Sequence, residues 1–234
     1  MHACASIPWY LVIVSKDRLC QNRMTKRTRR DRPLSQPTLP SSREIARLQT
    51  RLTQAWHGGE NAEAQNSALL SLIERQHRSN FDLWHEEDKA RAPDATDAQV
   101  ATVKRAIDKI NQQRNDQIEK IDDFLLEQLK EVKPAPSAPW NSETPGGIID
   151  RLSIISLKIY HMQEQVDRPD ASAQHRQNAQ QRLSILLAQQ NDLTTALGLL
   201  LEDLRGGRKQ MKVYRQFKMY NDPNYNPAIY GVKK

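Results

Sequence analysis

The chain has 234 residues and carries 35 lysine and arginine residues against 28 aspartate and glutamate residues, a formal net charge of +7. Aromatic residues make up only 6% of it, and it has eight glycines. This composition favours helices and argues against an extensive sheet. The two cysteines, Cys4 and Cys20, both lie near the N-terminus. A disulfide framework in the body is therefore excluded, and the cytoplasm is the expected location.

The basic residues are concentrated at the two ends of the chain. Residues 16–32 contain eight basic and two acidic residues, and residues 208–234 contain seven basic and one acidic residue. The stretch between them, 33–207, has 20 basic and 25 acidic residues. A globular protein that binds nucleic acid is expected to carry its basic patch on the folded body, so we expect no nucleic-acid partner. We also expect no membrane span, because no run approaches the roughly 18 apolar residues that one needs.

Residues 1–40 are predicted to be a disordered basic extension. The apolar patch "SIPWYLVIV" (6–14) is preceded by no lysine or arginine and followed by no small-residue cleavage motif, so it does not match a signal peptide. A second interpretation is that Met24 is the true start, followed by a short basic, proline-rich arm. Residues 41–230 are predicted to form a single helical domain, with a short tail at 231–234.

Five long helices are predicted from apolar periodicity and from helix-end signals. Ser41 or Ser42 caps the first helix, and Gly58 ends it. The fourth helix is apolar on two faces, which is typical of a central helix. The predicted fold is therefore an all-α, antiparallel bundle of about five long helices. The four later helices are expected over about 62–90, 97–132, 147–166 and 171–205.

The C-terminal segment "KVYRQFKMYNDPNYNPAIY" (212–230) alternates aromatic and basic residues before two turns that contain proline. We expect this tail to be partly extended and held on the bundle by its aromatic side chains, with its basic side chains in water. The alternative is that the aromatic rings stack on bases. The four aromatic residues in question are Tyr214, Phe217, Tyr220 and Tyr230.

Charged residues interrupt the apolar faces of three helices. Asp88 lies in the stripe of the second helix and Arg114 in that of the third. Because an isolated buried charge is costly, both should have partners. The simplest expectation is that Asp88 pairs with Arg114, since consecutive antiparallel helices bring such residues together. The alternative is a polar pocket for an anionic or polyhydroxyl ligand, to which His77, His85 and Asp150 would also contribute. Glu86 and Glu119 are expected to point to solvent.

No metal site or cofactor is predicted. A di-metal site in a bundle requires Glu-x-x-His on two helices, and Glu74–His77 supplies that spacing once, while His85–Asp88 has it reversed. Asp150 and His161 share a face of the fourth helix but are about 16 Å apart along its axis, too far for one ion. The sequence also lacks a glycine-rich phosphate loop and a cysteine nucleophile in the body.

Four stretches resemble the bacterial family catalogued as domain of unknown function 4254. They are "NFDLWHEEDKAR" (80–91), "INQQRNDQIEKID" (110–122), "ETPGGIIDRLSIISLKIYHM" (143–162) and "YRQFKMYNDPNYNP" (214–227). The resemblance covers roughly residues 43–230. It implies a helical cytoplasmic protein and a setting in cell-surface polysaccharide biosynthesis, where such proteins accompany glycosyltransferases. It implies no reaction.

Positions that match these motif blocks are site candidates by resemblance. His85, Asp88 and His161 are the candidates for catalysis. In "ETPGG", the free amides at the start of the fourth helix would suit a phosphate or a sugar carboxylate. The alternative is that Glu143 and Thr144 simply cap the helix. The candidates for ligand binding are Asn80, Trp84, Glu87, Arg114, Glu143, Thr144, Asp150 and Arg151.

Three functions remain open on the sequence. The first is a binding or accessory protein of a glycan pathway, with a polar cleft for a nucleotide sugar or a surface for a partner glycosyltransferase. The second is an enzyme acting on a phosphorylated or sugar substrate, with His85 or His161 as general base and Asp88 orienting it. The third is a structural helical homodimer.

Overall fold

The computed structural model describes residues 39–64, 67–217, 224–226 and 231. They lie in the unit of the chain that spans Gln36–Lys234. Within these residues there is no strand, only one isolated bridge between Trp140 and Gln210, so the all-α prediction is confirmed. The helices are α1 (Ser42–His57), α2 (Ala68–Ala90), α3 (Asp97–Gln128), α4 (Pro145–Asp167) and α5 (Ala173–Arg205). Residues 1–38 of the predicted extension, and Tyr220 and Tyr230 of the tail, lie outside the described residues.

Local side-chain chemistry fixes where the helices begin. Ser41 and Thr96 each form a capping box with a residue in the first turn, Glu44 and Gln99 respectively. The start of α2 differs from the prediction by six residues, because Ser67 caps the helix. The segment before it is held by a different bond, in which the Ala64 amide donates to the Glu74 carboxylate at 2.6 Å.

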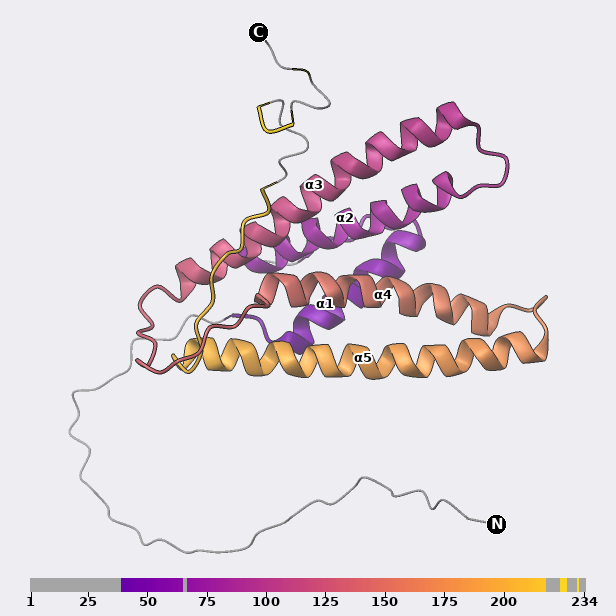
Figure 1. The fold of residues 1–234 in the computed structure, drawn as a ribbon. Coiled ribbons are helices and arrows are strands. Elements are labelled where there is room, and N and C mark those ends of the chain that lie inside the picture. The colour runs from indigo at the N-terminus through magenta and orange to yellow at the C-terminus, as the bar shows by residue number, and fades with distance from the viewer. Residues whose placement is uncertain (1–38, 65–66, 218–223, 227–230, 232–234) are drawn as a thin grey trace, which may run out of the picture. The chain divides into compact units, whose positions relative to one another are not determined.

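The helices form two antiparallel hairpins, α2–α3 and α4–α5, with α1 packed between them (Figure 1). The predicted central position of α4 is confirmed, since α4 contacts all four other helices. Leucine and isoleucine side chains from all five helices form the shared core. Fully buried examples are Ile45, Leu52, Ile73, Ile121, Leu152 and Leu197.

The two hairpins diverge toward their far turns (Figure 1). The first half of α3 is therefore covered mainly by α2, and Val100 of its predicted apolar stripe is 37% exposed. The last turns of α2 are similarly open: Asp88 and Lys89 are both exposed. The prediction that Asp88 faces the core is therefore wrong. Helical periodicity places Asp88 on the same face as the buried residues of α2, but this end of the face is not covered by the other hairpin.

The loop between α3 and α4 runs beside the beginning of the C-terminal tail. Gln210 donates its amide to Pro139 and accepts from the Asn141 amide, at 2.9 and 2.8 Å. Gly207 begins this contact with a positive φ of 65°, and a Cβ atom there would lie 2.8 Å from the Lys133 carbonyl oxygen, so glycine is required. The tail then crosses α3, where Arg215 pairs with Glu119 and Asp123.

Candidate functional site

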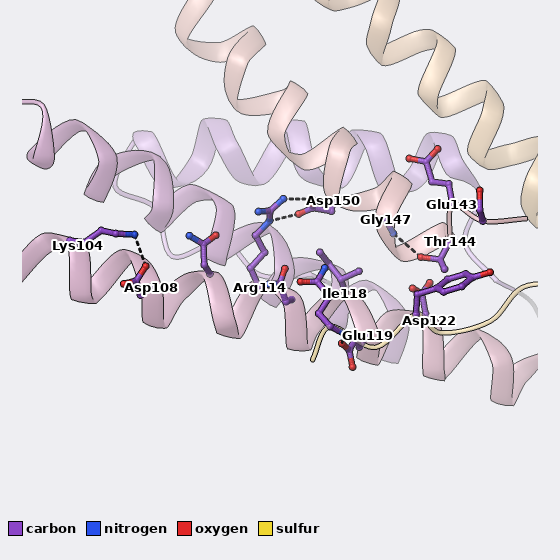
Figure 2. A pocket seen from close by; sticks show the side chains of 15 residues that line it. Lys104, Asp108, Arg114, Ile118, Glu119, Asp122, Glu143, Thr144, Gly147 and Asp150 are labelled. Carbon is purple, nitrogen blue, oxygen red and sulfur yellow. Dashed lines mark hydrogen bonds and ion pairs between the residues drawn. The ribbon is translucent and has the colours of Figure 1, made fainter. Parts of the chain in front are cut away.

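A groove of about 770 Å³ lies between α3, the start of α4 and the C-terminal tail (Figure 2). Its walls are mainly polar, and they bring together residues more than 100 positions apart in the sequence, from Lys104 to Gln216. Four of the predicted ligand-binding residues line it. These are Arg114, Glu143, Thr144 and Asp150.

Arg114 and Asp150 form a bidentate ion pair across the groove (Figure 2). The Arg114 Nε donates to Asp150 Oδ1 at 2.7 Å, and an Nη atom donates to Oδ2. Only 8% of the Asp150 side chain is exposed, against 24% of the Arg114 side chain. The hydrogen bonds to Asp150 raise the pKa of the Arg114 guanidinium, so Arg114 stays protonated. The predicted Asp88–Arg114 pair is wrong, because α4 rather than α2 supplies the partner.

A buried polar network continues from Asp150 into the bundle. The side-chain amides of Gln76 and Asn80 donate to Asp150 Oδ1 at 2.6 and 3.0 Å, and Asn80 also donates to the Ser153 hydroxyl at 2.8 Å. His77 lies between Ser153 and Thr53, at 2.7 and 3.0 Å. Asn80 and His77, two of the residues singled out in the sequence, thus share one network with Arg114 and Asp150.

The hydrogen bonds around His77 determine its tautomer. The Thr53 hydroxyl donates to the Gln49 carbonyl at 2.9 Å, so Thr53 can only accept from His77 Nε2–H. His77 Nδ1 then accepts from the Ser153 hydroxyl. Burial lowers the pKa of His77 to about 3, so the imidazole is neutral at physiological pH and its role here is structural.

Asp122 lies at the junction of α3 with the first turn of α4 and lines the groove. It is 2% exposed and accepts the Gly146 amide at 2.7 Å and the Thr144 hydroxyl. Burial raises its pKa to about 6 despite these two hydrogen bonds, and the nearby Asp123 and Glu119 add to the effect. Gly146 is needed for this contact, because a Cβ atom would lie 2.7 Å from the Ile118 carbonyl oxygen.

The first turn of α4 does not present free amides to the groove. The Gly146 amide is bonded to Asp122, and the Gly147 amide donates to the Thr144 hydroxyl at 3.2 Å. Glu143 pairs with Arg151 at 2.6 Å instead of capping the helix. A carboxylate of the chain itself therefore occupies the position where a helix start would bind an external anion.

The predicted catalytic histidines lie in an aromatic cluster away from this groove. His85 and His161 both contact the His57 ring edge to face, with centroids 5.2 and 4.8 Å away, and Trp84 stacks on His161 at 4.5 Å. His161 Nδ1 donates to Glu164 at 2.8 Å. Among the described residues no bond joins Asp88 to either histidine, so Asp88 does not orient a general base as predicted.

Two ring nitrogens of this cluster, Nε2 of His57 and Nε2 of His161, are buried. The His57 Nδ1 atom donates to the Thr53 carbonyl at 2.7 Å. Both Nε2 atoms are buried and lack a hydrogen-bond partner within the described part of the chain. Burial lowers the pKa of His57, and the neighbouring histidines lower it further. No group of three or more His, Cys, Asp or Glu in the described residues is placed to hold a metal ion.

The remaining candidates lie on surfaces outside the groove. Glu87 pairs with Arg91 at 2.8 Å, and Arg151 is exposed. Trp84, Glu87 and Asp88 line a second, smaller furrow between α2, α3 and α4. Contrary to expectation, Glu86 is only 20% exposed and pairs with Lys89, and Glu119 is 21% exposed and pairs with Arg215.

Several residues of the site are not among those predicted from the sequence, although two of them lie at positions that the apolar pattern marks. Asp122 lies four positions after Ile118 and three before Leu125, which is the spacing of the apolar stripe of α3. Gln76 falls between Ile73 and Asn80 with the same spacing. The contributions of Tyr214 and Gln216 to the groove carry no local signal, because they depend on where the tail crosses α3.

The groove is suited to hydrogen bonding with a polar ligand rather than to holding an anion. Carboxylates outnumber basic residues on its walls, and its two basic residues, Lys104 and Arg114, already pair with Asp108 and Asp150. Amide and hydroxyl groups supply further donors and acceptors. These come from Asn111, Asn115, Ser142, Thr144, Tyr214 and Gln216.

Comparison with known proteins places the chain in a family but gives no activity. No curated protein and no solved structure matches it. Among the described residues, no helix is both long and apolar enough to cross a membrane. The family described as protein of unknown function DUF4254 matches residues 70–213, a range that contains α3, α4, α5 and every charged residue of the groove. The chain therefore belongs to the DUF4254 family.

Proposed function

We propose that this protein is a cytoplasmic binding or accessory protein of bacterial cell-surface polysaccharide biosynthesis, and that it holds a sugar in the groove between α3 and α4. The pathway, and a glycosyltransferase as partner, rest on the family resemblance alone. The proposal of a sugar ligand rests on the groove itself, which has carboxylates, amides, hydroxyls and one aromatic side chain, Tyr214, on a single polar surface.

The chemistry of the walls favours a polyhydroxyl ligand. Each sugar hydroxyl both donates and accepts, so it pairs well with carboxylates and side-chain amides. The Arg114–Asp150 pair is held in place by Gln76 and Asn80, so the groove is formed before a ligand arrives, which lowers the entropic cost of binding. A volume of about 770 Å³ falls in the usual range for small-molecule sites.

The sugar of a nucleotide sugar fits this groove better than its phosphates do. Among the described residues that line the groove, neither basic side chain is left without a carboxylate partner. The first turn of α4 is also closed to anions by Asp122. We therefore place only the sugar in the groove.

The enzyme alternative loses its proposed general bases. His85 and His161 contact each other and other rings in the aromatic cluster, and His161 is bonded to Glu164. They line no part of the groove. A binding role is thus the simpler account of the polar surface.

Binding is tested by titrating the ¹⁵N-labelled protein with glucose, UDP-glucose and UDP and following backbone amide shifts. We expect the two glucose compounds, but not UDP alone, to shift the amides of Gly147 and Asn115. Ser142→Trp places a ring in the groove and should abolish these shifts. Ser137→Trp is the matched control, because Ser137 is exposed in the same loop but does not line the groove. Shifts that survive Ser142→Trp would place the ligand elsewhere, and a protein that responds to no sugar would contradict the proposal.

A further inference from the structure

Asp122 differs from every other charged residue that lines the groove, because it has no cationic partner. Seven charged residues line the groove. Lys104 pairs with Asp108 at 2.6 Å and Arg114 with Asp150. The two remaining wall carboxylates, Glu119 and Glu143, pair with arginines outside the lining, Arg215 and Arg151. Within the described chain, Asp122 forms hydrogen bonds but no ion pair.

The surroundings of Asp122 make this lack of a partner costly. The carboxylate is 2% exposed, so water screens it poorly. Its two hydrogen-bond donors, the Gly146 amide and the Thr144 hydroxyl, are neutral. Glu119 and Asp123 lie nearby on the same helix and repel a negative charge at Asp122. A positively charged group in the groove would relieve both penalties.

We propose that the ligand carries a protonated amine that pairs with Asp122, so that the groove selects an amino sugar over a neutral sugar. This inference rests on the proposed function, since it specifies the ligand of the same groove. Asp122 lies beside Thr144 at the α4 end of the groove, and the hydroxyl- and amide-bearing walls extend from there past Arg114 (Figure 2). The ammonium group would therefore sit at one end of the groove and the ring along its length.

An ammonium group fits the acceptors near Asp122. It has three donors, and the described groove offers the carboxylates of Asp122 and of Glu119, which lies one turn earlier on α3. A charge-assisted hydrogen bond in a partly dehydrated site is about twice as strong as a neutral one. A sugar with a hydroxyl or an acetamido group in place of the amine can still donate to the carboxylate, but it carries no positive charge to offset that of Asp122.

The pairing makes binding depend on pH in a defined direction. Asp122 has a pKa of about 6, so it binds an ammonium ion as a carboxylate at neutral pH and loses this attraction when protonated. The charged groups that act on it are Asp123 and Glu119, on the same helix. The other charged residues that line the groove are Lys104, Asp108 and Arg114 on α3, Glu143 in the loop before α4 and Asp150 on α4. Lys104 and Arg114 already pair with Asp108 and Asp150, and Arg215 of the tail is shared by Glu119 and Asp123.

The inference is tested with D-glucosamine, D-glucose and N-acetyl-D-glucosamine as probes, by the same amide-shift titration at about pH 7 and about pH 5. We expect glucosamine to bind at least about tenfold more tightly than glucose at the higher pH, and this preference to shrink at the lower pH. Asp122→Asn keeps an acceptor for the Gly146 amide and should remove the preference while glucose binding is retained. Asp116→Asn makes the same charge change elsewhere on α3, at an exposed residue outside the groove lining that accepts from Gln112, and should keep the preference.

The possible results separate this inference from the proposed function. If glucosamine and glucose bind equally and Ser142→Trp abolishes both, the pairing of an amine with Asp122 is overturned and sugar binding in the groove is supported. A glucosamine preference that survives Asp122→Asn would also overturn it. Absence of any sugar binding would overturn both. An unchanged amide spectrum outside the groove shows that Asp122→Asn is folded.

Discussion

At the scale of single residues, the charge on Asp122 opposes folding at neutral pH. The pKa of this carboxyl rises from 3.8 to about 6 on folding because it is buried. The folded protein therefore keeps a proton that the unfolded chain releases, and its stability falls as the pH rises through this window.

Asp122→Asn should remove this pH dependence. We expect the free energy of unfolding of the variant to exceed that of the wild type by up to about 3 kcal/mol above about pH 7, and the gain to disappear below about pH 4. Urea unfolding followed by circular dichroism at a series of pH values measures it. A gain that stays constant across the whole range would contradict the assignment of the raised pKa to Asp122.

The sequence indicated that Arg114 is partly buried and needs a counterion, but not which one. Helical phase places a residue on a face of its own helix, whereas the partner depends on which helix covers that face. Asp150, 36 positions away, was identified as an inward residue, yet sequence order favoured Asp88. Removing one member of such a pair costs about 3–5 kcal/mol, so the partner matters to stability as much as to the site.

At the scale of elements, the close approach of α3 to the start of α4 shapes the groove. Gly146 allows this approach, because its missing side chain leaves room for the Ile118 carbonyl and the Asp122 carboxylate. The neighbouring Gly147 is not constrained in this way: a Cβ atom there would lie 3.5 Å from the Thr144 hydroxyl oxygen, an ordinary contact.

Gly146→Ala should therefore destabilise the protein, and Gly147→Ala should not. We expect Gly146→Ala to lower the free energy of unfolding by about 1–3 kcal/mol, the usual cost of forcing an extra methyl group into a packed site. Gly147→Ala, measured in the same urea titration, should lie within about 0.5 kcal/mol of the wild type. Equal losses in the two variants would indicate a general effect of side chains in the first turn of α4 rather than the close contact.

The helices themselves were largely predictable, because their signals are local. Caps such as Ser41 and Thr96, and the glycine after α1, act within one turn, and four of the five helices begin within about two residues of their predicted starts. The exception is α2, which begins at Ala68. The Ala64 amide is held outside this helix by a bond to the carboxylate of Glu74, which lies in the second turn of α2. The position of Asp88 could not be predicted, because it depends on the angle between two hairpins.

At the scale of the whole molecule, the C-terminal tail completes a site that begins in α3. Arg215 holds the tail on α3 through Glu119 and Asp123, at 3.0 and 2.7 Å, and so brings Tyr214 and Gln216 into the groove. These are exposed contacts that salt weakens. They position the tail but contribute little to the stability of the bundle.

Arg215→Ala should release the tail without unfolding the bundle. We expect chymotrypsin to cleave after Tyr214 about tenfold faster, sugar affinity to fall, and the thermal midpoint to stay within about 2 °C. Arg168→Ala is the control, because it removes an exposed ion pair with Asp170 far along α4 from the groove. A large drop in the thermal midpoint for Arg215→Ala alone would show that the tail is part of the core instead.

The position of α1 between the two hairpins has a consequence for synthesis of the chain. The Gln49 side chain, buried in α1, donates to the Ile149 carbonyl of α4, 100 positions later in the chain. At about 5–20 residues per second, a ribosome needs roughly 5–20 s to make the segment between them. During that interval much of the apolar face of α1 is without its final partners. Of the five described helices, α1 is made first and therefore most needs protection from aggregation in a growing chain.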